Sequence, residues 1–272
     1  MENPFVFSDS VFDKDYTPEG LAQSVGYRLN NVHSFKGIGS AWVLNELSGS
    51  SLDPYMFGAQ GRWNSEWSPN WQSTAGAAIF SIINRDKLGN TDVPNINVGN
   101  ERVAMPTATS PAPTYAFNTM VFDAGVTYTI AGGVPLYNAK FPITLSGDYS
   151  NNNSAPRDHQ GYSFGVVFGK SGKKGLWDAM YRYKHLEANA WYEEFLNSDS
   201  GAYYATAPLN SNQGAGYRPG TNIKGHEAKI QYSPYDSVTF GLTGYFLDTI
   251  NTAPGTVSGD IIRVQADVVV KF

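Results

Sequence analysis

The residue types that most often carry chemistry are few in this chain and lie far apart. The 272 residues contain no cysteine and only four histidines, His33, His159, His185 and His226. Without cysteine there are no disulfides, thiolate zinc sites or cysteine nucleophiles. The histidines also lack the i, i+4 or paired spacing of a metal site. We therefore expect neither a metal nor another cofactor.

One serine and one histidine could still support hydrolysis. Ser163 lies on the predicted strand that precedes His185, and some membrane-barrel hydrolases use such a pair near the outer rim. Strand alternation, however, places His185 with Tyr183 on one face and Ser163 on the other, whereas a nucleophile and its base must be within hydrogen-bond reach. We expect no enzyme. A barrel hydrolase that uses His185 or His226 remains an alternative.

Asp9, Asp13 and Asp15 could offer oxygen ligands to calcium. Their spacing differs from that of a 12-residue EF-hand loop with its glycine at position 6. We expect an acidic loop in solvent.

A larger set of charged residues follows the polar faces of predicted strands. Both signs are present, and charges facing each other across a water-filled pore would order permeating solutes. A salt-bridged, packed interior without conduction is the alternative. The predicted pore-lining residues are Arg28, Arg62, Asp123, Asp148, Asp178, Arg182, Lys184, Glu227, Lys229, Arg263, Asp267 and Lys271.

Strands with a period of two must position these charges. From Ile262 to Phe272, apolar residues alternate with mostly polar ones, as in a wall between lipid and water. Similar segments are predicted at 5–7, 21–29, 35–44, 55–63, 71–83, 119–130, 141–149, 162–169, 177–185, 223–232 and 237–246. Segment 179–195 also fits a helix, but a strand is favoured there. Residues such as Phe164, Phe168, Phe240, Phe246 and Val264 should then face lipid.

Composition agrees with a β protein. Aromatic residues make up 14% of the chain, with 28 glycines and 15 prolines, which favours strands separated by turns. No apolar run is long enough for a membrane helix, whereas membrane strands leave average hydropathy low. The net charge of −5 is carried without a basic tract, so nucleic acid is not expected as a partner.

The predicted links between strands alternate between short and long. The short ones are 30–34, 65–69, 131–138, 171–174 and 233–236, and the long ones are 9–19, 45–53, 85–113, 150–158, 196–222 and 248–258. This parity is typical of outer-membrane barrels, with short periplasmic turns and long extracellular loops. We predict an all-β, transmembrane, antiparallel up-and-down barrel of about 12 strands, in one domain spanning 1–272, with both ends periplasmic. Trp63, Trp67, Trp71, Trp177 and Tyr235 should form the periplasmic aromatic girdle.

The long loop 85–113 is predicted to fold inward and constrict the pore. Its charged residues would then face Arg182, Lys184, Arg263 or Asp267 across water, where low-dielectric walls strengthen their effect. A solvated outer loop is the alternative. The predicted constriction residues are Arg85, Asp86, Lys87, Asp92, Glu101 and Arg102.

The opening segment adds a family resemblance. Asn3-Pro4-Phe5, an acidic stretch to Asp15, Thr17-Pro18-Glu19-Gly20-Leu21-Ala22 and the terminal Phe272 resemble a porin family of Gram-negative bacteria. In that family the opening block lies inside a longer polypeptide with an export signal, so the chain resembles a C-terminal portion. The resemblance implies an outer-membrane porin for passive diffusion of small hydrophilic solutes or ions. Its partners would be outer-membrane lipid and those solutes, with a homo-oligomer as an open alternative. A non-conducting structural or adhesive barrel is the other alternative.

Overall fold

The computed structural model describes residues 1–49, 51–89, 99–103, 111–197, 199, 220–251 and 261–271. Most of them form one large sheet. Its strands are β1 Glu19–Arg28, β2 His33–Val43, β3 Tyr55–Glu66, β4 Trp71–Ile83, β7 Phe117–Ile130, β8 Phe141–Asn152, β9 Gln160–Gly169, β10 Leu176–Leu186, β11 Ile223–Tyr235, β12 Val238–Thr249 and β13 Ile261–Val270. The long loops add a two-residue pair, β5 Arg102–Val103 with β6 Ala112–Pro113, and the short 3-10 helices η1 Arg85–Lys87 and η2 Glu193–Phe195.

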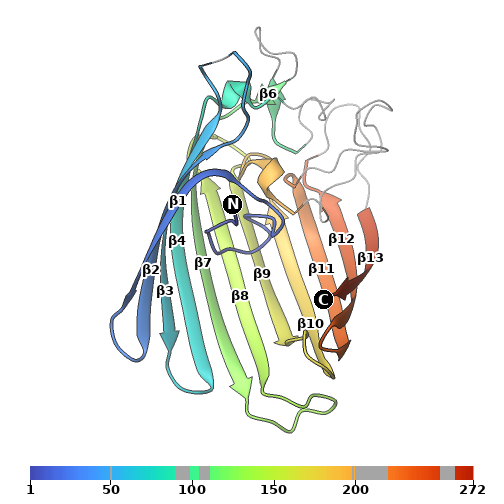
Figure 1. Cartoon of the computed structure of the whole chain (residues 1–272). Coiled ribbons are helices and arrows are strands. Elements are labelled where there is room, and N and C mark those ends of the chain that lie inside the picture. The colour runs from blue at the N-terminus through green and yellow to red at the C-terminus, as the bar shows by residue number, and fades with distance from the viewer. Residues whose placement is uncertain are drawn as a thin grey trace.

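The sheet is a simple up-and-down arrangement. Each strand pairs antiparallel with the strands next to it in the order β1-β2-β3-β4-β7-β8-β9-β10-β11-β12-β13. The links at one end of the sheet are mostly shorter than those at the other (Figure 1), but the ten residues between β7 and β8 exceed the seven between β8 and β9 at the opposite end. The all-β class is therefore confirmed, and the sorting of links by length holds with that exception. Of segment 179–195, which also fitted a helix, residues 179–186 lie in β10 and residues 193–195 form η2.

In the described residues the sheet has eleven strands, against the predicted number of about 12, because residues 5–7 are not a strand. This miscount also misplaced the beginning of the sheet. Glu19 of β1 pairs with Val43, beside the long link that follows β2. The chain thus enters β1 from the long-loop end, as the predicted long link 9–19 indicated, and because residues 5–7 form no strand the sheet begins at that end and not at the short-turn end.

The sheet is open, which corrects the prediction that the first and last strands pair. Within the described residues β1 pairs with β2 and β13 pairs with β12, and no ladder joins β1 to β13. Neighbouring strands run in opposite directions, so β1 and β13, the first and the eleventh in the order, run in the same direction. An antiparallel bond between these two edges would need them to point in opposite directions.

The two faces of the sheet differ in composition. Because successive side chains point to opposite faces of a strand, the apolar series of β9 and β13 all project to one side, called here the outer face. Phe164 is 52% exposed there and Ile262 is 70% exposed. The other side, the inner face, carries Arg62, Asp148 and most of the other strand charges.

Residues 3–16, called here the inner segment, lie against the inner face of the sheet (Figure 1, dark blue). Phe5 packs against Trp42 and Phe80, with ring centroids 5.4 and 4.9 Å apart. Phe12 contacts the same two rings and also Trp191, from the connection after β10. Phe5 and Phe7 therefore pack into this aromatic core, because burial of a Phe ring is strongly stabilising.

No helix among the described residues is both long and apolar enough to cross a membrane.

Candidate functional site

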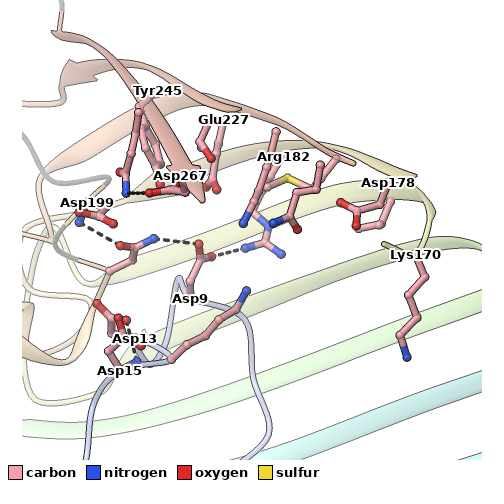
Figure 2. Close-up of a pocket in the computed structure, with 18 of the residues that line it drawn as sticks. Asp9, Asp13, Asp15, Lys170, Asp178, Arg182, Asp199, Glu227, Tyr245 and Asp267 are labelled. Atoms are coloured by element: carbon pink, nitrogen blue, oxygen red, sulfur yellow. Dashed lines mark hydrogen bonds and ion pairs between the residues drawn. The ribbon is translucent and has the colours of Figure 1, made fainter. Parts of the chain in front are cut away.

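A cluster of charges at the centre of the inner face joins the inner segment to β10. Arg182 and Lys184 are two residues apart on β10, so both side chains project to the same face. Arg182 Nη1 binds Asp9 Oδ1, and Lys184 Nζ lies 3.9 Å from Asp9 Oδ2. Lys184 Nζ is also 3.2 Å from Glu227 Oε2 of β11. Figure 2 shows Asp9 reaching from the inner segment towards Arg182.

Asp9 is held as a carboxylate in this cluster. It is 8% exposed, and burial by itself would raise its pKa. The positive charges of Lys184 and Arg182 outweigh that burial, and Asn197 Nδ2 donates a hydrogen bond of 3.2 Å to Oδ2. The pKa of Asp9 is therefore well below its ordinary value, because every one of these partners favours the charged form.

A second set of contacts anchors the inner segment on the other side of Asp9. Ser8 Oγ donates a hydrogen bond of 2.6 Å to Asp148 Oδ2, and Ser163 Oγ donates to the same oxygen at 2.7 Å. Arg62 Nη1 binds Asp123 at 2.8 Å and donates to the carbonyl of Val6 at 2.8 Å. The charged side chains on the inner face of the sheet thus hold the backbone and side chains of residues 6–9 in place.

A groove of about 410 Å³ opens beside the cluster, between the inner segment and the inner face of β9 to β13 (Figure 2). Both charge signs line it, and we call it the mixed-charge groove. Its acidic residues are Asp9, Asp13, Asp15, Asp178, Asp199, Glu227 and Asp267, and its basic residues are Lys14, Lys170, Arg182 and Lys229. A smaller cavity of about 210 Å³ lies on the opposite side of residues 6–8, beside Asp123 and Asp148. Arg182 lines both spaces.

The structure gathers most of the predicted pore-lining residues on the inner face. Arg62, Asp123, Asp148, Arg182, Lys184 and Glu227 take part in the contacts above, while Asp178, Lys229 and Asp267 line the groove. Arg263 Nη2 binds Asp199 at 2.9 Å, beneath the same groove. The remaining two lie apart at strand ends: the exposed Arg28 donates to the carbonyl of Asn30, and the exposed Lys271 follows β13.

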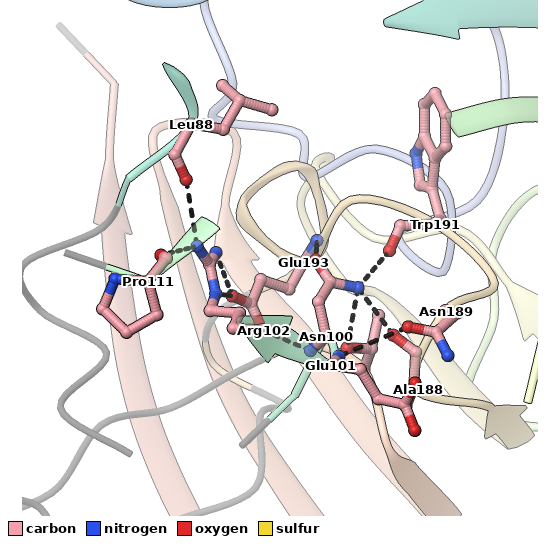
Figure 3. Close-up of polar contacts among 10 residues, drawn as sticks. Leu88, Asn100, Glu101, Arg102, Pro111, Ala188, Asn189, Trp191 and Glu193 are labelled. Carbon is pink, nitrogen blue, oxygen red and sulfur yellow. Dashed lines mark hydrogen bonds and ion pairs between the residues drawn. The ribbon is translucent and has the colours of Figure 1, made fainter. Parts of the chain in front are cut away.

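A buried ion pair connects two long loops on the long-loop side. Arg102 Nη2 lies 2.5 Å from Glu193 Oε1, and both side chains are 0% exposed. Arg102 also donates to the carbonyls of Leu88 and Pro111, at 3.0 and 3.2 Å. Asn100 extends the contact, since its backbone N–H donates to Glu193 Oε2 at 2.8 Å (Figure 3).

Other members of the predicted constriction loop bind nearby groups on the same side. Arg85 donates to the carbonyl of Pro113, and Lys87 lies 3.5 Å from Asp86. Glu101 pairs with Arg157, from the link between β8 and β9, at 2.8 Å. Asp92 lies outside the described residues. The described contacts therefore tie loop 85–113 to its neighbouring loops.

The histidines lie away from the central cluster. His185 stacks on Tyr162 with centroids 5.0 Å apart, while the Ser163 hydroxyl donates to Asp148 on the inner face. Serine and histidine thus occupy opposite faces, as alternation indicated. In the part of the chain that the structure describes, no group of three or more His, Asp or Glu residues could hold a metal ion.

The sequence interpretation missed the inner segment as part of the site. Asp9 was assigned to a solvated acidic loop, which was wrong, because it is buried and ion-paired. Ser8 and Asn197 were not considered. The signal available in the sequence was Phe5, Phe7 and Phe12 around these acids, since an apolar sequence seldom remains in solvent.

Comparison with known proteins adds no relative: no protein-family model matches the chain, and no curated protein matches it.

Proposed function

We propose that the chain forms wall strands of an outer-membrane porin, through which small hydrophilic solutes or ions diffuse passively. One observation carries this proposal: an up-and-down antiparallel sheet with an apolar outer face, a charged inner face, and links that are mostly short at one end and long at the other. Lipid suits the outer face, because alternation of apolar and polar residues matches a boundary between lipid and water. The resemblance of the opening block to Gram-negative porins gives the same expectation.

The polar groove supports the proposal further. Ionised side chains of both signs line a space of about 410 Å³, large enough for a small hydrated solute. Charged groups are tolerated on the inner side of a barrel wall when water reaches them, and they set selectivity by electrostatics. Under this proposal the wall charges, Arg182 and Lys184 first among them, determine which solutes pass.

Planar-bilayer recording tests the proposal directly. The protein should produce discrete conductance steps, and neutralising Arg182 together with Lys184 should shift the permeability ratio towards cations. Arg28→Gln with Lys271→Gln is the matched control, since it removes two positive charges at strand ends away from the groove. A correctly inserted protein that gives no conductance in any variant would contradict the proposal.

The packed interior supports a second candidate, a non-conducting barrel whose long loops bind partners. The inner segment fills part of the inner face with aromatic side chains and ion pairs, which reduces the room for water. Barrels of small strand number are filled in this way. Absence of conductance combined with specific binding to the long-loop side would favour this candidate over a porin.

A further inference from the structure

The central cluster has one feature that a wall alone does not explain. Two cations stand side by side on β10, and the carboxylate between them comes from a separate segment of the chain. Arg182 forms an ion pair with Asp9, and Lys184 forms ion pairs with both Asp9 and Glu227. Arg182 is 16% exposed and Lys184 is 0% exposed, so both cations have lost most of their hydration. Such cations bind a carboxylate strongly, an arginine most of all, because its planar donors match the two oxygens.

Solutes can reach this position from two sides. Arg182 lines the mixed-charge groove and also the cavity of about 210 Å³ beyond the inner segment. The turn that carries Asp9 is short: the backbone N–H groups of Val11 and Phe12 both donate to the carbonyl of Ser8. Phe5 and Phe12 on either side are anchored in the aromatic core. Displacement of Asp9 therefore has to be accommodated within residues 8–10, between these two anchored rings.

We infer that Asp9 occupies, as an internal ligand, a carboxylate-binding site formed by Arg182 and Lys184, and that a small amino acid-like zwitterion displaces it. This inference rests on the proposed function and names its solute class. The solute carboxylate replaces Asp9 on Arg182, and its ammonium group meets the acidic side of the groove, where Asp178 and Asp267 lie. A solute with only a negative charge is disfavoured, because seven acidic residues line the same groove against four basic ones.

The exchange links binding to opening of the pore. While Asp9 is bound to Arg182, the turn 8–10 separates the groove from the smaller cavity. When the solute takes Arg182, the turn loses its main ion pair and the two spaces can join. We call the arrangement with Asp9 bound to Arg182 the docked state. In this state the hydroxyls of Ser8 and Ser163 both donate to Asp148 Oδ2, so the proximity of these two residues can be used to measure docking.

A disulfide assay tests the exchange without depending on conductance. The chain has no native cysteine, so Ser8→Cys with Ser163→Cys gives a single pair, whose closure under an added oxidant is followed on full-length protein in lipid vesicles. Glutamine serves as the zwitterion, with acetate and methylammonium at equal ionic strength as its two halves. At a concentration about ten times its Kd, glutamine should reduce the docked population, and with it the crosslinking rate, about tenfold. Acetate should have a weaker effect and methylammonium none.

Two variants control for the charge. Arg182→Gln in the cysteine pair should abolish the response to glutamine, whereas Arg157→Gln, which removes the same charge on the long-loop side, should preserve it. An unchanged rate with glutamine, or equal slowing by methylammonium, would overturn the inference. Bilayer recordings before and after oxidation then separate the two proposals. If the reduced and oxidised forms both fail to conduct while glutamine still slows crosslinking, the porin function fails and the binding site stands.

Discussion

At the scale of single residues, the buried pair of Arg102 and Glu193 holds the long loops together. Removing one member leaves the other charge buried without its partner, which typically costs about 3–5 kcal/mol. We predict that Arg102→Ala lowers the free energy of opening of the connection that carries Glu193 by about that amount. Hydrogen exchange of the amides at 188–196 measures it.

The neighbouring pair of Arg157 and Glu101 provides a matched comparison. The Arg157 side chain is 66% exposed, and exposed ion pairs contribute little because water and salt screen them. Arg157→Ala should leave exchange at 188–196 unchanged. Equal effects of the two substitutions would mean that burial does not determine the strength of the loop contact.

Asp9 gives a prediction about pH. Because its pKa is lowered in the folded chain, its contribution to docking is fully present above its ordinary value of 3.8 and is lost as pH falls through the lower folded-state value. An environment-sensitive fluorophore at Val6→Cys should therefore report a docked inner segment at pH 5 and release only under stronger acid. In Asp9→Asn this acid-dependent component should be absent. Release of the native segment between pH 7 and pH 5 would contradict the assignment.

Gly76 leaves room for the ion pair between Arg62 and Asp123, which helps to hold the inner segment. A Cβ at position 76 would collide with Asp123 Oδ1 and lie 2.9 Å from Arg62 Nη1. Gly76→Ala should separate Arg62 from Asp123 and destabilise the protein by about 1–3 kcal/mol, the usual cost of overpacking. Gly61→Ala is the control, because its Cβ would meet nothing within 4 Å. Denaturant unfolding in detergent compares the two.

At the scale of elements, the two faces of each strand should label differently in a bilayer. Cysteines at Val264 and Phe240 on the outer face should resist a water-soluble, membrane-impermeant thiol reagent. Cysteines at Gln265 and Asp267, which line the mixed-charge groove, should react. Reaction of the outer set with protection of the inner set would reverse the assigned faces and remove the basis for a lipid-facing wall.

The strands could be predicted from this sequence, whereas the packing of the inner segment against the inner face of the sheet could not. Period-two alternation reveals which residues share a face, and every predicted segment from 21–29 onward overlaps a strand of the sheet in the described residues. Phe5 and Phe12 follow no such rule. Their position depends on Trp42, Phe80 and Trp191, rings far away in sequence, and side-chain packing of this kind leaves no local pattern. For the same reason Asp9 was unrecognised as the partner of Arg182.

At the scale of the whole molecule, the open edges predict where the chain can be crosslinked. Ser24 of β1 and Val269 of β13 lie on the two outermost strands. Cysteines at these positions should form no disulfide within one chain under mild oxidation, because the strands do not pair. In membranes both edges should instead be covered by further strands, since an unpaired backbone group in lipid costs several kcal/mol. A rapid intramolecular disulfide would show that the sheet closes on itself.

The shared direction of β1 and β13 has an arithmetic consequence. Around a ring in which every neighbour is antiparallel, directions alternate, so the total must be even. This sheet contributes eleven strands, which is an odd number. A closed antiparallel ring that includes it therefore needs an odd number of additional strands. A second copy would add eleven strands, an odd number, but in the same orientation its edge strands run in the same direction as β1 and β13, so the two copies would meet through parallel edges. A lone strand is the smallest complement that closes an antiparallel ring, and the parity of the complement can be counted in any larger assembly that contains this sheet.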